Sequence, residues 1–323
     1  MSKRFENKKL FYILGILLII LAVTFIVKIP REKSTLKTTL VRFDTTQVER
    51  IIIIPKASAG EKFEFFRDNK TWKVKQGEII SKPRDGAVEN ILSDLLSIKP
   101  SNLVSVSKSK WQDYDLTDSL AIRVRVENKK GKALADVMIG RFSYKPVSNP
   151  YGGGYGGSID GISYVRLYTE EPVYAVDGFL TFSFSGDFDD WRDKTLIRCK
   201  GDDITKITFT FPADSGFVLE KKENKWYASG ELADSAAIAS YINTITYTDG
   251  EKFIESFRPV SSPVCQTLIE GNNLLNITVK CYSDENGRII LNSSLNPEAF
   301  FIDENKNVFN QIFKPLSHFK NKK

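Results

Sequence analysis

The sequence predicts an α+β protein: an N-terminal transmembrane helix followed by two tandem, similar, mostly antiparallel β units, each with one main helix. Three observations predict this fold. An apolar run lies near the N-terminus, a strand–loop–Trp pattern occurs twice, and a helical pattern of apolar residues follows each Trp. The 323 residues can build two cores, and the apolar fraction of 41% excludes a disordered chain.

The apolar run from Leu10 to Val27 predicts the transmembrane helix. It contains no charged residue, and at about 1.5 Å per residue it would span roughly 27 Å, close to the hydrocarbon thickness of a bilayer. Lysines flank it on both sides. The run is longer than the apolar core of a signal peptide, and no A-x-A cleavage motif follows it. We therefore expect an uncleaved anchor that binds the lipid bilayer through Leu10 to Val27.

The charges around this run predict its orientation. Four basic residues precede it, Lys3, Arg4, Lys8 and Lys9, and such a cluster favours the cytoplasmic side. Basic residues after the run weaken the contrast, but the short N-terminal tail leaves the large remainder as the part to be exported. We expect a single-pass protein of the bacterial inner (cytoplasmic) membrane, with the N-terminus inside and the main domain on the periplasmic, extracytoplasmic side.

Repeated motifs predict an internal duplication. A strand-like run ends at Pro55 in the first half and at Pro212 in the second. A hairpin is expected after each proline, with a polar Asn-Lys turn before Trp72 in one copy and Trp226 in the other. The phenylalanines that precede these tryptophans at equal spacing are Phe63 and Phe217.

Each copy continues with a helix and further strands. Amphipathic helices are expected over 84–98 and 233–247. The strands expected next are 120–126 and 134–139 in the first copy, joined by a turn at 128–131, and 274–282 and 288–291 in the second, joined by a turn at 284–287. Towards their ends the copies overlay without a gap when Ser163–Phe184 is placed on Glu298–Phe319.

These patterns predict the following organisation. The segments are a cytoplasmic tail 1–9, a transmembrane anchor 10–28, a spacer 29–40, a first repeat unit 41–194, a second repeat unit 195–320 and a basic tail 321–323.

Composition excludes several functions. The chain has one histidine, His318, so a histidine-based catalytic triad would depend on a residue near the C-terminus. The excess of Lys+Arg (46) over Asp+Glu (40) is small and concentrated at the two ends, so we expect no nucleic-acid partner. Cys265 and Cys281 could meet across neighbouring strands, but the sequence leaves open whether they form a disulfide or are core residues.

A glycine-rich segment of the first unit is the candidate partner-binding loop. It has no counterpart in the second unit, and neither Lys-Ser/Thr nor a helical pattern follows it, so it fits no nucleotide-binding motif. Tyrosines on a permissive glycine backbone favour contact with a partner. The loop consists of Tyr151, Gly152, Gly153, Gly154, Tyr155, Gly156 and Gly157.

Other motifs are better explained structurally. The S-x-x-K matches at 34–37 and 107–110 lack the further motifs of serine–lysine enzymes. The acidic cluster at 187–193 lacks the spacing and terminal Glu of a calcium loop. We therefore assign no catalytic residue, no metal ligand and no cofactor, and we expect that the protein is not an enzyme.

The order of short motifs along the chain resembles the bacterial domain-of-unknown-function family 4340. The motifs are Trp72 after a charged turn, Leu95-Leu96, Asp113–Leu116, Ile139-Gly140, Tyr164–Arg166, Val173-Tyr174 and Trp191–Lys194. One departure is Ser119, which stands where the family has a proline. Because members are typically encoded beside ABC-transporter subunits, including gliding-motility-type ones, the resemblance implies a transporter permease and ATPase as partners.

The expected function is that of a membrane-anchored extracytoplasmic accessory or scaffold subunit, associated with an ABC-type transporter or a gliding-type envelope complex. The alternative is an envelope glycan-binding module or a hydrolase that uses two carboxylates, with Trp111, Tyr151 and Tyr155 as exposed aromatic contacts. A third reading is a purely structural spacer in the envelope.

Overall fold

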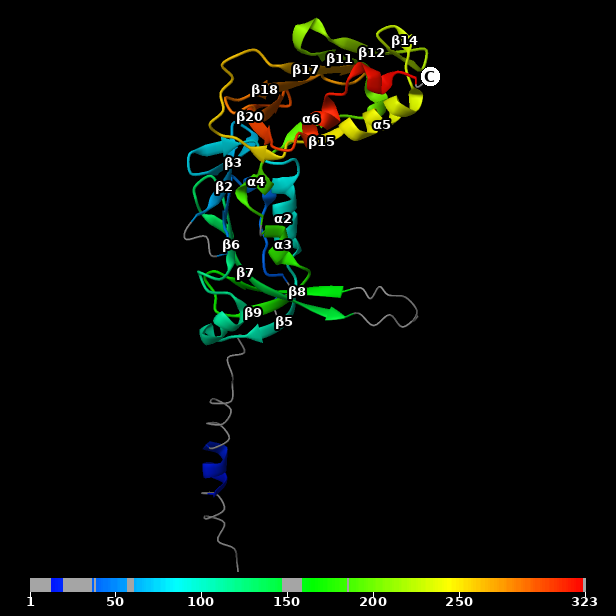
Figure 1. Ribbon diagram of the computed structural model, residues 1–323. Helices are drawn as coiled ribbons and strands as arrows, with labels where there is room; N and C mark the ends of the chain where they lie inside the picture. Colours follow the sequence, from blue (N-terminus) through cyan, green and yellow to red (C-terminus); the bar gives the residue numbers. More distant parts are fainter. Residues whose placement is uncertain are drawn as a thin grey trace, which may run out of the picture.

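The computed structural model describes residues 13–19, 37, 39–56, 61–146, 159–184 and 186–321. Its main features are two nine-stranded antiparallel sheets, one in each half of the chain, and a two-stranded sheet of β10 (Thr195–Arg198) and β15 (Tyr247–Asp249). Figure 1 shows the second sheet stacked on one end of the first unit.

The first sheet has the order β4-β3-β2-β1-β6-β7-β8-β9-β5. Its main helix is α2 (Ala87–Ser97), and the shorter helices α3 (Leu180–Phe184) and α4 (Phe188–Trp191) follow the last strand. The strands are β1 (Arg50–Ile54), β2 (Phe63–Asp68), β3 (Thr71–Gln76), β4 (Ile79–Ser81), β5 (Pro100–Ser105), β6 (Ile122–Glu127), β7 (Ala133–Pro146), β8 (Ile159–Leu167) and β9 (Val173–Asp177).

The second sheet has the order β14-β13-β12-β11-β17-β18-β19-β20-β16. Its main helix is α5 (Ser235–Ile245), and α6 (Asn307–Ile312) follows the last strand. The strands are β11 (Ile204–Thr210), β12 (Phe217–Lys222), β13 (Lys225–Ala228), β14 (Glu231–Leu232), β16 (Lys252–Phe253), β17 (Cys265–Gly271), β18 (Ile277–Ser283), β19 (Ile289–Ser293) and β20 (Asn296–Asp303).

Short 3₁₀ helices connect several of these elements. They are η1 (Thr45–Gln47), η2 (Lys108–Lys110), η3 (Gln112–Tyr114), η4 (Gly201–Asp203), η5 (Pro212–Asp214) and η6 (Leu316–Phe319).

The two sheets have the same topology. In both, four strands lead to one edge and four lead towards the other, which a ninth strand closes. In the first unit this strand is β5, the one that follows α2, whereas in the second unit β15 follows α5 and pairs with β10, and the next strand, β16, closes the edge. The prediction of two similar, mostly antiparallel units, each with one main helix, is therefore confirmed. A further repeat that the overlay did not use lies at the start of each unit: Thr39-Leu40-Val41-Arg42 recurs as Thr195-Leu196-Ile197-Arg198.

One prediction about how the two copies correspond is wrong. Placing Ser163–Phe184 on Glu298–Phe319 pairs β8 with β20, whereas the sheet order pairs β8 with β19 and β9 with β20. The overlay slipped by one strand because neighbouring strands share the same alternation of side chains, so periodicity does not distinguish them. The turn over 284–287 accordingly corresponds to the β7–β8 connection.

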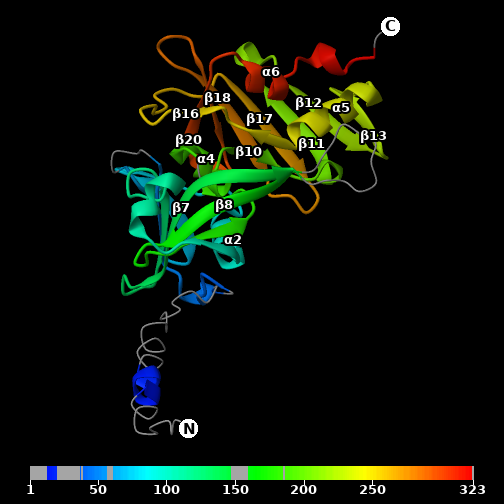
Figure 2. The same ribbon diagram turned by 90° about the horizontal axis from the view of Figure 1, so that it is seen from below.

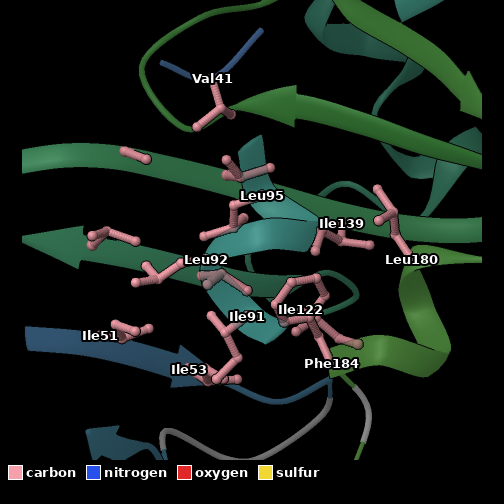
Figure 3. Packing of buried hydrophobic residues seen from close by; sticks show 14 of the residues in the cluster. Val41, Ile51, Ile53, Ile91, Leu92, Leu95, Ile122, Ile139, Leu180 and Phe184 are labelled. Atoms are coloured by element: carbon pink, nitrogen blue, oxygen red, sulfur yellow. The ribbon is translucent and has the colours of Figure 1, made fainter. Parts of the chain in front are cut away.

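Alternating apolar residues position the first core. Ile51 and Ile53 of β1 are fully buried on one face of the sheet, and Ile91 and Leu95 of α2 pack onto that face (Figure 3). The helical spacing of these apolar residues turns one stripe of α2 towards the sheet. Each such side chain stabilises the fold by about 1.5–3 kcal/mol through burial.

The second core is richer in aromatic residues. Phe209 of β11 stacks on Phe217 of β12 with ring centroids 4.4 Å apart, and Tyr241 of α5 meets Phe319 edge-on at 5.0 Å. The buried hydroxyl of Tyr241 donates a 2.7 Å hydrogen bond to the Ile312 carbonyl. This bond satisfies the one polar group that α5 inserts deeply into the core.

The end of each unit is hydrogen-bonded to the backbone just before its main helix. The Arg84 amide donates to the Trp191 carbonyl in the first unit, and the Asp234 amide donates to the Phe319 carbonyl in the second, at 2.8 and 2.9 Å. Isolated bridges lie beside both bonds, Pro83↔Arg192 and Ala233↔Lys320. Arg192 and Lys320 therefore occupy equivalent positions.

The predicted anchor is described only over residues 13–19, which are helical and carry exposed aliphatic side chains. In the part of the chain that the structure describes, no helix is both long and apolar enough to cross a membrane. The other residues of the segment 10–28, most of the spacer 29–40 and the tail 1–9 lie outside the described residues.

Candidate functional site

The predicted partner-binding loop, Tyr151 to Gly157, lies outside the described residues. The structure describes the two strands that lead to it, and β7 and β8 remain paired as far as Pro146↔Ile159. The neighbouring strand β6 begins at Ile122, opposite Ile139, and so does not pair with the later part of β7. Residues 142–146 and 159–161 therefore form a two-stranded extension, which we call the ribbon. Figures 1 and 2 show the ribbon projecting from the body of the first unit.

One face of the ribbon carries exposed apolar residues. Phe142 and Tyr144 lie two positions apart on β7 and so point to the same face, and Ile159 lies opposite Pro146 on that face. Phe179 and Phe182, from the segment after β9, pack against Phe142 with ring centroids 5.6 and 4.8 Å away. The exposed fractions are 39% for Phe142, 63% for Tyr144, 58% for Ile159 and 61% for Phe182. We call Phe142, Tyr144, Ile159, Phe179 and Phe182 together the aromatic face.

Two glycines let the ribbon leave the sheet and receive this cluster. A Cβ at Gly140 would collide with the Tyr114 carbonyl, and the β7–β8 register shifts at this point, between Ile139 and Phe142. A Cβ at Gly161 would lie 2.5 Å from the Phe179 ring, so this ring packs on bare backbone. Larger residues at either position would displace the ribbon or the ring.

The two units meet around Arg192, which follows α4 and is only 4% exposed. Its guanidinium lies 3.5 Å from the centroid of the Phe253 ring in the second unit, and Nη1 is 2.6 Å from Glu255 Oε1. Towards its own unit it contacts Ser81 Oγ and Asp189 Oδ1, at 2.8 and 2.9 Å. One buried cation therefore links the end of the first unit to the second.

Asp193, the next residue, is also buried at this junction. Lys82 Nζ lies 2.6 Å from its Oδ2, the Thr195 amide donates to Oδ1, and Asn296 Nδ2 donates to its carbonyl. Burial alone would raise the pKa of Asp193, but the bonds from Lys82 and Thr195 outweigh it and the pKa is lowered. The carboxylate therefore stays charged and binds both sides of the junction.

The other carboxylates of the acidic cluster at 187–193 have structural partners as well. Asp187 and Asp190 form a capping box at the start of α4, and Asp189 pairs with Arg192. Within the described residues no group of three or more potential ligands could hold a metal ion.

A cleft of about 470 Å³ lies beside the junction. Trp72, Pro83, Val88 and Pro297 give it apolar walls, and its charged residues are Lys73, Lys82, Arg84, Asp85, Glu89 and Glu298. Sequence reasoning missed this cleft because its walls come from β3, the β4–α2 connection, the start of α2 and the start of β20, which only the fold brings together.

Two sequence candidates have internal partners. Trp111 is half-buried, the Arg166 guanidinium lies 3.6 Å from its ring centroid, and its Nε1 donates to the Glu171 carbonyl. One ring face is therefore covered, which weakens its role as a glycan platform. In the S-x-x-K match at 107–110, the bond to Asp113 raises the pKa of Lys110, which is the wrong direction for a general base.

Comparison with known proteins gives one match. Residues 81–263, more than half of the chain, match the family described as a domain of unknown function, DUF4340. No curated protein and no solved structure matches the chain. The match runs from the end of β4 through the junction to the segment after β16, so it covers parts of both units. The resemblance inferred from the motif order is confirmed: the chain belongs to the DUF4340 family.

Proposed function

We propose that this protein is a membrane-anchored extracytoplasmic accessory subunit that binds a membrane partner through the aromatic face of the first unit. The observation that carries the proposal is the exposure of that face on an extension that the second unit lacks. The surfaces of soluble proteins rarely carry several large apolar side chains side by side, and such patches commonly mark sites of contact with another protein or with a membrane.

The N-terminal segment supports the membrane part of the proposal. The run from Leu10 to Val27 lacks charge, and the six aliphatic residues of its described part, 13–19, are each more than half exposed. Aliphatic residues on all sides of a helix favour a lipid environment over water. We propose the orientation that the basic N-terminal cluster predicts, with both β units outside the cytoplasm.

The family membership supports the choice of partner. The resemblance implies a permease and an ATPase of an ABC-type or gliding-type transporter as partners, and of these the permease is the membrane partner. We therefore propose that the aromatic face contacts the permease, and that the ATPase subunit is recovered through the permease.

Co-purification tests this proposal. The full-length tagged protein, solubilised in mild detergent, should recover a permease and an ATPase. The double variant Tyr144→Ser/Phe182→Ser should lose most of this recovery, whereas Leu275→Ser, at an exposed position of the second unit, should not. Equal recovery with both variants would remove the aromatic face from the proposal, and recovery of no membrane partner would refute the accessory role.

Topology is tested separately. Protease added to intact spheroplasts should digest both β units, as it does after lysis. Protection in spheroplasts with digestion after lysis would place the units in the cytoplasm.

The cleft beside Trp72 favours a second candidate function, glycan binding. An indole ring with three carboxylates along the same cleft, Asp85, Glu89 and Glu298, is a combination that can bind a sugar ring and its hydroxyl groups. Calorimetric titration with soluble cell-wall glycan fragments should give binding that Trp72→Ala abolishes. Absence of binding by the unmodified protein would eliminate this candidate.

A further inference from the structure

The structure brings together two of the three cysteines. Cys265 of β17 and Cys281 of β18 are direct register partners in the middle of the second sheet. Both side chains point to the buried face, with Thr267 and Ile269 on one strand and Ile277 and Val279 on the other. Their exposed fractions are 6% and 1%. Both are free thiols in this structure.

We propose that Cys265 and Cys281 form an intramolecular disulfide when the second unit folds in an oxidising compartment. Opposed residues of antiparallel strands have Cβ atoms about 4.5–5.5 Å apart, and a disulfide needs about 3.5–4.5 Å. A small local approach of the strands therefore closes the bond. The compartment rests on the proposed extracytoplasmic location.

The first unit has two residues without thiols at the positions equivalent to Cys265 and Cys281. There the register partners on β6 and β7 are Ile122 and Ile139, both buried in the core. Two cysteines have less apolar volume than two isoleucines, so this pair contributes less burial to the second unit. A covalent bond between the strands offsets that loss.

The third cysteine is placed differently. Cys199 follows β10, is only partly buried and packs against the edge of the second core. It has no cysteine as register partner, and it provides an internal control for thiol reactivity.

Formation of the bond requires a disulfide oxidant that accepts two electrons, either an envelope thiol–disulfide oxidoreductase or glutathione disulfide. One thiolate attacks the oxidant, forming a mixed disulfide and releasing one thiol. The second cysteine thiolate then displaces the other thiol. The pair loses two protons and two electrons, and the oxidant disulfide is reduced to two thiols.

The order of events follows from burial. Burial is the main reason that the pKa of Cys265 is raised and that of Cys281 is raised to about 12, so few thiolates exist in the folded sheet. Oxidation should therefore be fast during folding and slow once the reduced protein has folded.

Thiol trapping and mass spectrometry test the proposal on the full-length protein in detergent. The protein is denatured, reduced and refolded with reduced and oxidised glutathione, and is then denatured again in the presence of an alkylating agent. Only Cys199 should react, and digestion should yield a peptide linked through Cys265 and Cys281. The bond should favour the folded state roughly 100-fold, as expected for a loop of this length. In a Cys199→Ala background, further change of either Cys265 or Cys281 to Ala should abolish the linkage.

Three measurements keep this proposal distinct from the proposed function. If all three thiols react after oxidative refolding, the disulfide is refuted whatever the location of the protein. If the bond forms in vitro, protease protection in spheroplasts would refute the extracytoplasmic location while the bond itself stands. If the units are exported and the thiols isolated from cells are free, the disulfide is refuted and the location stands.

Discussion

The two units share one strand order but differ where side chains face outward or meet the neighbouring unit. In the first unit β7 and β8 extend into the ribbon, whereas β18 and β19 are joined by the short turn at 284–287. Arg192 is buried at the junction, while its equivalent, Lys320, pairs on the surface with Glu231. The difference teaches that one strand order can carry different connections and different junction contacts in the two units.

The largest effect is expected at Arg166 of β8, whose register equivalent in β19 is Asn292. Arg166 is 1% exposed and donates to the carbonyls of Leu116, Leu167 and Tyr168. Arg166→Ala would remove a buried cation and its bonds to the Leu116 and Tyr168 carbonyls, while Leu167 would keep the Glu170 amide as donor. We therefore expect a loss of about 3–5 kcal/mol in the free energy of unfolding, measured by urea denaturation.

The matched change in the second unit should cost less. The Asn292 amide donates to the Pro297 and Ala299 carbonyls at 3.2 and 2.8 Å. Asn292→Ala removes neutral hydrogen bonds, so a loss of about 1–3 kcal/mol is expected. An equal or larger loss than for Arg166→Ala would show that the buried guanidinium of the first unit does not contribute more to stability than the amide at the same position of the second.

Asp193 at the junction should make stability depend on pH, and its replacement should reduce that dependence. Because the pKa of Asp193 is lowered in the folded state, its contribution is present above the unfolded value of about 3.8 and is lost as pH falls through the folded value. Asp193→Asn should destabilise the protein at neutral pH and flatten the acid side of its stability curve. An unchanged acid limb, measured by thermal unfolding between pH 6 and about 3, would contradict this role.

The caps of the two main helices offer a smaller contrast. Asp234 accepts hydrogen bonds from the Ala236 and Ala237 amides at the start of α5, whereas α2 begins at Gly86 without a side-chain cap. Asp234→Ala should cost about 1 kcal/mol through the lost cap. Gly86→Ala should cost a similar amount for a different reason, because φ is +75° at Gly86.

The smallest effect on stability is expected at the ribbon itself. Replacing residues 143–161 by the four residues 284–287 would give the first unit the short connection of the second and would keep Ser163, which is buried and bonds to the Gly178 carbonyl and the Leu180 amide. Because the core residues remain, the urea midpoint should stay close to that of the parent protein, while recovery of the membrane partner should fall to background. A large loss of stability would show that the ribbon supports the fold.

The sequence predicted local features well. The turns at 128–131 and 284–287 are predicted correctly because Asn, Asp and Gly favour turn conformations. Trp72 and Trp226 correctly indicate equivalent hairpins in the two units. The correspondence of the later strands failed because β8, β9, β19 and β20 have similar apolar patterns. Strand pairing is a long-range property, which period-two patterning does not encode.

The candidate site was predicted only in part. The glycine-rich composition pointed to the β7–β8 connection, but the aromatic face depends on Phe179 and Phe182, which follow β9 and reach the ribbon only in the folded sheet. The cleft beside Trp72 likewise needs Glu298 from the other unit. No spacing along the chain relates these residues, so a single sequence contains no signal for their contact.

The return of each unit to the start of its own main helix has an evolutionary consequence. Because Trp191 and Phe319 bring the end of each unit beside Arg84 and Asp234, a copy can be inserted or removed without threading one chain segment through another. A protein built from such units can grow by whole copies, each with its own hydrophobic core. A change in the number of copies would then change how far the outermost surface lies from the membrane without altering any one core.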